Sequence, residues 1–188
     1  MLARSVARHP ELALAARLRI HTVGLLLVPL AAITVAWVQP VDFDYWWHVE
    51  TGEYIVRSQT IPRSDIFSFT SAGEPWVDHE WLSQVLMFAI DSTAGYAALF
   101  LAMFGLGVLA WALTYKLLRE HAVGPMQALM LSAVPASFGA MYWRARPSMF
   151  TVFFCAYLLV ELSRARDQRR SLWHLPVLMA LWTNLHGG

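Results

Sequence analysis

The hydrophobic residues of this chain gather in five long segments that are separated by shorter polar stretches. The segments cover residues 20–38, 97–118, 123–143, 148–162 and the stretch from 172 onward. About 20 apolar residues cross a bilayer as a helix, and the arginines that follow the short fourth segment can reach toward the membrane surface. The pattern therefore predicts an all-α fold, a polytopic membrane helix bundle with about five transmembrane helices.

A polar stretch of residues 39–95 separates the first two segments and predicts a structured outer loop with amphipathic helices. The sequence DYWWHVETGEYIVRS indicates a helix on which Asp44, His48 and Thr51 share one face. The segment IFSFTS alternates apolar and polar residues, which is typical of a short extended strand. Asp78 then caps a second helix, whose apolar positions recur at helical spacing. We expect this second helix to lie on the membrane surface or against the spans.

The composition favours a membrane protein independently of the pattern. The chain is 57% hydrophobic and 14% charged, whereas a typical soluble domain is about 25% charged. The single cysteine, Cys155, excludes a disulfide within the chain. The sequence has no zinc-type Cys/His spacing, no glycine-rich phosphate loop and no basic-aromatic pattern of the kind that binds nucleic acid. We therefore expect membrane lipid, and no nucleic acid, among its partners.

The cationic residues indicate an orientation in the membrane. If the segments alternate in direction, ten of the 14 lysines and arginines fall on one side. These ten are Arg4, Arg8, Arg17, Arg19, Lys116, Arg119, Arg164, Arg166, Arg169 and Arg170. By the positive-inside rule that side is cytoplasmic. The basic arm of residues 1–19 is then in the cytoplasm and the loop of residues 39–95 is outside.

Four polar clusters fall together on the outer side. They are Asp42 with Asp44 and His48, Asp78 with His79 and Glu80, Arg144 with Arg146, and Asn184 with His186. Acids, histidines and arginines that converge at one interface supply what an outward-facing active site needs. A structural interpretation stays open for each cluster, because aspartates cap helices and arginines anchor helix ends at lipid phosphates.

These features resemble the GT-C superfamily of membrane glycosyltransferases, which includes oligosaccharyltransferase catalytic subunits and protein mannosyltransferases. The stretch DFDYWWHVETGEYI resembles their Asp followed by two aromatic residues and His after the first span. The stretches IPRSDIFSFTSAGEPWVDHEWL, RARPSMF and LWTNLHGG resemble those of uncharacterised bacterial multi-span proteins grouped with the same superfamily. The resemblance covers about residues 20–188.

The resemblance implies a transferase that moves a sugar from a polyprenyl-phosphate carrier to an acceptor glycan, lipid or protein. The reaction would take place on the outer face of the bacterial cytoplasmic membrane. The resemblance assigns Asp44, with Asp42 second, as the catalytic carboxylate that takes the proton of the acceptor or positions it. The substrate-binding candidates are the remaining polar side chains of the clusters: His48, His79, Glu80, Arg144, Arg146 and His186. The two arginines would bind the phosphate.

The resemblance leaves the cofactor open. Some relatives use a divalent cation and others do not, and Asp44 and His48 have the spacing to reach one ion. We predict no cofactor firmly and assign no metal ligand. Members of the superfamily have more spans than this chain, so we expect residues 97–188 to be a truncated part of a longer helix bundle.

Two other classes of protein fit parts of the pattern. A non-catalytic multi-span scaffold that binds a partner through its outer loop predicts an exposed apolar patch on the loop and no cavity between loop and spans. A transporter predicts ionisable residues at the middle of the membrane, and the five segments contain almost none.

Overall fold

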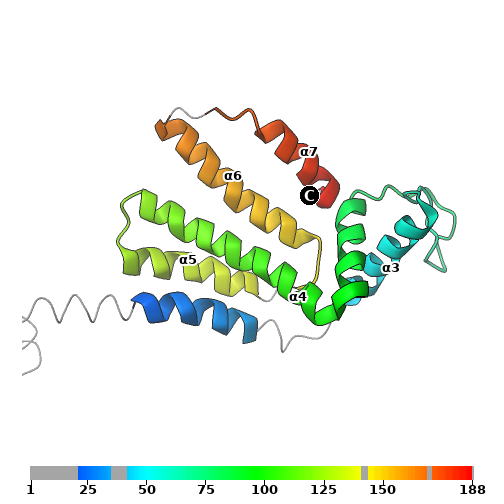
Figure 1. The fold of residues 1–188 in the computed structure, drawn as a ribbon, viewed down its shortest axis with the longest axis horizontal. Helices are drawn as coiled ribbons and strands as arrows, with labels where there is room; N and C mark the ends of the chain where they lie inside the picture. The colour runs from blue at the N-terminus through cyan, green and yellow to red at the C-terminus, as the bar shows by residue number, and fades with distance from the viewer. Residues whose placement is uncertain (1–20, 35–41, 141–143, 169–170, 188) are drawn as a thin grey trace, which may run out of the picture.

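The computed structural model describes residues 21–34, 42–140, 144–168 and 171–187. This part of the chain has six helices and no strand, which confirms the predicted all-α class. The helices are His21–Thr34, α3 (Phe43–Ser58), α4 (Trp81–Glu120), α5 (Pro125–Ala140), α6 (Ser148–Gln168) and α7 (Leu175–Leu185) (Figure 1). The basic arm of residues 1–19 and the ends of the first and third predicted spans lie outside the described residues.

Two of these helices are long and apolar enough to cross a membrane. They are α4 and residues Ser148–Asp167 of α6. The sequence predicts about five spans, but only two helices among the described residues have the length of a span. The helices His21–Thr34, α5 and α7 are shorter. The 11 residues of α7 correspond to about 16 Å of helix, roughly half the thickness of the hydrocarbon core.

The longest helix, α4, bends at Gly95, whose φ of 78° and ψ of 173° are readily adopted only by glycine. The residues before Gly95 lie beside α3, and the residues after it run alongside α5 and α6 (Figure 1). The helix predicted after Asp78 and the span predicted over residues 97–118 are therefore two arms of one bent helix.

The outer arm of α4 begins at Trp81, and the cap predicted for Asp78 is wrong. The N-cap position is Glu80, which makes no side-chain cap bond, and Asp78 Oδ1 accepts the Glu80 N–H at 3.3 Å from outside the helix. The face buried against α3 consists of Ser83, Gln84 and Met87. Of the apolar positions at helical spacing, Leu82 and Val85 are partly buried and Leu86 and Ala89 are exposed. The burial of this arm therefore follows its packing in the fold and not its apolar stripe.

The contact between α3 and the outer arm of α4 is close because Gly52 lies in it. A Cβ atom on Gly52 would collide with the carbonyl group of Gln84 and lie 2.8 Å from the Cβ of Phe88. Nearer the kink, the Tyr45 hydroxyl donates to Asp91 at 2.5 Å. These contacts hold the predicted loop helix, which the structure confirms as α3, against the start of α4.

Residues 59–80 form a compact loop, and the extended strand predicted for IFSFTS is wrong. The carboxylate of Asp65 accepts the backbone N–H groups two and three residues further along, which bends the chain there. Phe67 and Trp76 then pack against Trp47 of α3, with ring centroids 5.9 and 4.8 Å away. The loop therefore folds back onto α3.

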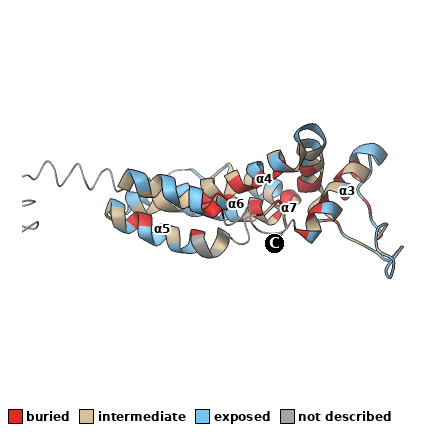
Figure 2. Ribbon diagram, turned by 90° about the horizontal axis from the view of Figure 1, so that it is seen from below, coloured by how far each residue is buried: buried red, intermediate tan, exposed pale blue. Residues whose placement is uncertain are grey.

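The inner arm of α4, α5, α6 and His21–Thr34 lie side by side (Figure 1). Their shared core is narrow and includes Leu99, Met103, Trp111, Leu129 and Met149. Exposed and intermediate residues cover much of every helix (Figure 2). Many of the exposed side chains are large and apolar, so these helices present a hydrophobic outer surface.

We expect Gly52→Ala to destabilise the protein by about 1–3 kcal/mol, because the added methyl group must push α3 away from the backbone of α4. Thermal unfolding in detergent measures the change. Gly105→Ala in the inner arm of α4 is the matched control, since no atom lies within 4 Å of its Cβ position. An unfolding temperature for Gly52→Ala that is equal to or above that of the control contradicts the expected packing.

Candidate functional site

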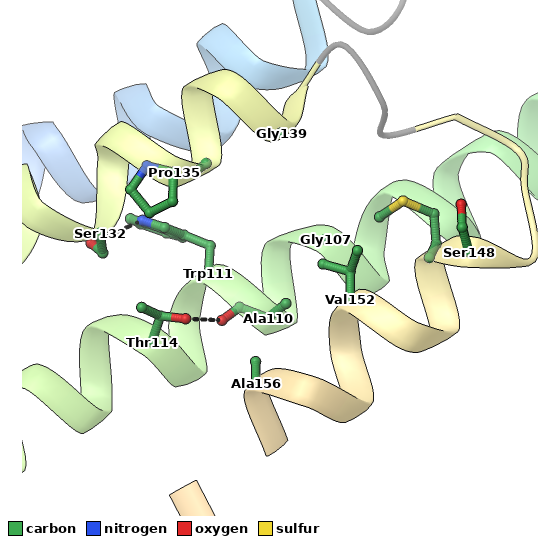
Figure 3. A pocket seen from close by; sticks show the side chains of 12 residues that line it. Gly107, Ala110, Trp111, Thr114, Ser132, Pro135, Gly139, Ser148, Val152 and Ala156 are labelled. Carbon is green, nitrogen blue, oxygen red and sulfur yellow. Dashed lines mark hydrogen bonds between the residues drawn. The ribbon is translucent and has the colours of Figure 1, made fainter. Parts of the chain in front are cut away.

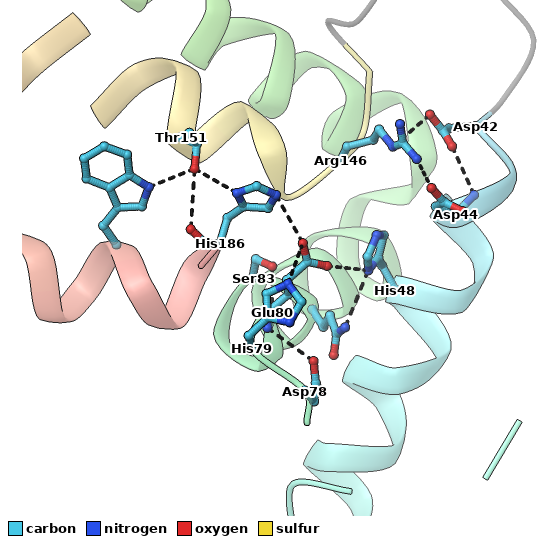
Figure 4. Close-up of polar contacts among 12 residues, drawn as sticks. Asp42, Asp44, His48, Asp78, His79, Glu80, Ser83, Arg146, Thr151 and His186 are labelled. Atoms are coloured by element: carbon cyan, nitrogen blue, oxygen red, sulfur yellow. Dashed lines mark hydrogen bonds and ion pairs between the residues drawn. The ribbon is translucent and has the colours of Figure 1, made fainter. Parts of the chain in front are cut away.

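A polar pocket of about 380 Å³ lies where α3, the start of α4, the segment before α6 and the end of α7 meet (Figure 4). It is lined by Asp44, Trp47, His48, Glu80, Arg146, Pro147, Ser148 and His186. Five of the residues predicted from the sequence as a site therefore come together, from all four predicted clusters. The other three lie beside the pocket: Asp42 and Arg144 pair with each other, and the exposed His79 approaches Glu80.

One side of the pocket is an acid–arginine group. Asp42 is the N-cap of α3: its Oδ1 accepts the Asp44 N–H at 3.0 Å, and its side chain is 7% exposed. The other carboxylate oxygen of Asp42 lies 3.1 Å from Arg146 Nε and 3.6 Å from Arg144 Nη1. Arg146 also forms an ion pair with Asp44 through Nη2. Asp42 thus has the structural role that the sequence left open, whereas Asp44 faces the pocket.

The other side of the pocket is centred on Glu80, whose side chain is 16% exposed. Glu80 Oε1 lies 3.2 Å from His186 Nε2 and 3.7 Å from His79 Nε2, and Oε2 lies 3.6 Å from His48 Nδ1. Burial raises the pKa of Glu80 above the usual range of a glutamate. Because the three histidines come from separate parts of the chain, no local spacing in the sequence predicts that they meet at one carboxylate.

The two histidines that line the pocket are neutral near pH 7. Burial lowers the pKa of His48 to about 4, although the negative charge of Asp42 opposes the shift. Burial, reinforced by the nearby His79, also lowers the pKa of His186. Glu80 is therefore a carboxylate that faces neutral imidazoles, and Asp44 is one that faces a permanent cation.

The sequence analysis missed Thr151, which lies one helical turn after the pocket-lining Ser148 on α6. Its Oγ1 lies 2.8 Å from His186 Nδ1 and accepts the indole N–H of Trp182, also at 2.8 Å. Asn184, which the sequence grouped with His186, instead accepts the indole N–H of Trp81 and ties α7 to α4. A threonine inside an apolar run gives no sequence signal, because such residues also bond within their own helix.

A site for a divalent cation would need several ligand side chains close together. Across the described ranges, no three or more His, Cys, Asp and Glu side chains are arranged to hold a metal ion. The resemblance leaves a divalent cation open, and no residue is assigned as its ligand.

A second, apolar pocket of about 470 Å³ lies between the inner arm of α4, α5 and α6 (Figure 3). Its lining includes Gly107, Trp111, Pro135, Met149 and Val152, and the Trp111 indole N–H donates to Ser132 on its wall at 3.1 Å. Ser148 lines both pockets. The polar and the apolar pocket therefore adjoin at the first turn of α6.

Comparisons of the chain with protein families, with curated proteins and with solved structures find no significant match. Function is therefore inferred from the residues and geometry of the site.

We expect the stability of the protein to fall as the pH is lowered from about 6.5 to about 4. In this window the unfolded chain protonates His48 but the folded chain does not, so protons favour the unfolded state. The shift corresponds to a loss on the order of 3 kcal/mol. Unfolding temperatures measured across this range should fall less steeply for His48→Gln than for the unmodified protein, and equal slopes contradict a neutral buried His48.

Proposed function

We propose that this chain is a membrane glycosyltransferase, or its amino-terminal part, that moves a sugar from a polyprenyl-phosphate carrier to an acceptor on the outer face of the membrane. One observation carries the proposal. Asp44 and Arg146, an acid and a cation suited to phosphate, line the same pocket as Glu80 and His186. A volume of about 380 Å³ is within the usual range of small-molecule sites.

Arg146 is the proposed phosphate ligand. The guanidinium group has five N–H donors, so its contacts to Asp42 and Asp44 leave donors for phosphate oxygens. Arg144 adds a second positive charge next to it. A leaving phosphate gains negative charge as the bond to the sugar breaks, and these arginines stabilise that charge.

The apolar pocket supports a lipid-linked substrate. Because Ser148 lines both pockets and follows Arg146 by two positions, a phosphate at Arg146 has an apolar cavity next to it. A substrate with a charged head and an isoprenoid tail matches this pair of pockets. A water-soluble nucleotide sugar leaves the apolar pocket without a role.

The proposed setting is a multi-pass membrane bundle with a cytoplasmic amino terminus and an outer loop. The apolar stretches of α4 and α6 are only 39% and 22% buried, whereas the core helix of a soluble protein is mostly buried. The shorter helices α5 and His21–Thr34 lie alongside the inner arm of α4, so a membrane that contains this arm would contain them as well (Figure 1). The distribution of lysines and arginines favours the loop of residues 39–95 being outside.

The alternative of a non-catalytic scaffold has one observation in its favour. The outer loop exposes large apolar side chains, among them Phe43, Phe69 and Val77, and Phe69 is 99% exposed. Such residues suit a partner or the membrane surface equally. A scaffold, however, has no use for a polar pocket between loop and spans, so the transferase is the better-supported function.

Deletion of the gene in its own host, followed by restoration of single variants, tests the transferase. The deletion should remove a sugar mass from envelope glycans, and the unmodified protein should restore it. Arg146→Ala should transfer about 10- to 100-fold more slowly, because charge-assisted hydrogen bonds to phosphate contribute about 1.5–3 kcal/mol. Asp44→Asn tests the carboxylate that the resemblance assigns.

Arg57→Ala is the control, since Arg57 lies on the exposed surface of α3, where it forms an ion pair with Glu53. It should restore the sugar fully at equal protein level. If deletion changes no glycan mass, the scaffold is the better interpretation.

A further inference from the structure

We propose that Glu80, and not Asp44, is the general base that takes the proton of the acceptor hydroxyl. This inference rests on the transferase function proposed above. It reassigns the role within the same pocket and gives Asp44 the task of holding Arg146 in position.

The carboxylates on the Arg146 side are poorly suited to accept a proton. Asp42 uses one oxygen to cap α3 and the other for the two arginines. Asp44 forms an ion pair with Arg146. An acceptor hydroxyl would have to compete with a guanidinium for these carboxylate oxygens. Both aspartates are therefore better anchors for Arg146 than bases.

Glu80 has the opposite environment. The titratable groups that face it are His48 from α3, His186 at the end of α7, and Asp78 and His79 from its own segment. Burial is the main influence on the pKa of Glu80 and raises it, so this carboxylate binds a proton more readily than an exposed glutamate does. Arg146 pairs with the aspartates on the other side of the same pocket and has no ion pair with Glu80 among the described residues.

A chain of polar contacts runs from Trp182 through Thr151 and His186 to Glu80 (Figure 4). The Trp182 indole can only donate, so it donates to Thr151 Oγ1 at 2.8 Å. The Thr151 hydroxyl oxygen in turn lies 2.8 Å from His186 Nδ1 and 3.4 Å from the carbonyl oxygen of His186. We assign the Thr151 proton to the shorter of these two contacts, so that Nδ1 accepts it and the proton of the neutral imidazole is on Nε2, which lies 3.2 Å from Glu80 Oε1.

This arrangement leaves one carboxylate oxygen for the acceptor. Glu80 Oε2 lies 3.6 Å from His48 Nδ1, beyond hydrogen-bond range, and Glu80 lines the pocket. Thr151 and Trp182 are positioning residues, because they act on Glu80 only through His186.

The proposed step is a displacement at the anomeric carbon of the sugar. The acceptor oxygen forms a bond to that carbon while its proton passes to Glu80 Oε2. The bond between the anomeric carbon and the phosphate oxygen breaks, and its electron pair stays on the phosphate next to Arg146. The products are the glycosylated acceptor, polyprenyl phosphate and a protonated Glu80, which then loses its proton to water.

The test uses purified protein with lipid-linked sugars extracted from membranes of the deletion host, and farnesyl phosphate as a binding probe. Glu80→Gln should lower the rate of transfer about 100- to 10,000-fold and bind farnesyl phosphate as the unmodified protein does. Asp44→Asn should mainly weaken binding of the probe, because Arg146 loses a partner. Its pH–rate profile should keep the acidic limb that reports Glu80.

Thr151→Val keeps the shape of the side chain but removes the hydroxyl. Without the bond to Nδ1, the Nε2 proton of His186 is no longer fixed toward Glu80, and its carboxylate is less stabilised. The acidic limb of the pH–rate profile should therefore move to higher pH, an effect that a purely structural threonine does not produce. This variant also serves if Glu80→Gln does not fold.

Three outcomes count against the inference, and they are distinguishable. Full transfer by Glu80→Gln, with transfer lost in Arg146→Ala, overturns Glu80 as base and leaves the transferase intact. An unmoved acidic limb in Thr151→Val also overturns Glu80 as the oriented base. No transfer and no binding of farnesyl phosphate by the unmodified protein overturns the transferase function and the base together.

Discussion

The close approach of α3 to α4 at Gly52 is the constraint on which the rest of the pocket depends. Helices usually pack with their axes about 8–10 Å apart, and an absent side chain lets one backbone approach the other. Here Gly52 contacts the carbonyl of Gln84, one turn after Glu80. His48 lies one turn before Gly52 on α3. The same contact therefore sets the separation of His48 and Glu80, and with it the width of the pocket.

The sequence predicts the helices and the members of the site better than it predicts their contacts. Apolar runs and the polar face of DYWWHVETGEYIVRS follow from local periodicity, so α3 and the site residues Asp44, His48, Arg146 and His186 are accessible to reasoning from the sequence. The contacts of His48 and His186 with Glu80 depend on the packing of α3, α4 and α7, which no local pattern encodes. The predicted strand at IFSFTS is wrong because the carboxylate of Asp65 accepts two backbone N–H groups and bends the chain there. Among the described residues there is no neighbouring strand with which this segment could pair.

The two sides of the pocket differ in how their charge is compensated. The aspartates at the start of α3 form ion pairs with arginines. Glu80 has no such cation among the described residues: it faces the neutral imidazoles of His48 and His186, and burial raises its pKa. The carboxylates of one pocket thus lie in two different environments, one beside arginines and one beside histidines. Different environments give chemically alike carboxylates different roles.

The order of the pocket residues along the chain has a consequence for biogenesis. The pocket draws on residues from Asp44 to His186, and Thr151 and His186 complete the orientation of Glu80. In a membrane, α3 and the outer arm of α4 would emerge and pack well before α6 and α7 are inserted. Until α7 is in place, Glu80 lacks the contact with His186 and keeps only His48 and His79 as imidazole neighbours. Under the function proposed above, the pocket would therefore be complete only after insertion of the last helix, and a partly synthesised chain would lack the contact that orients Glu80.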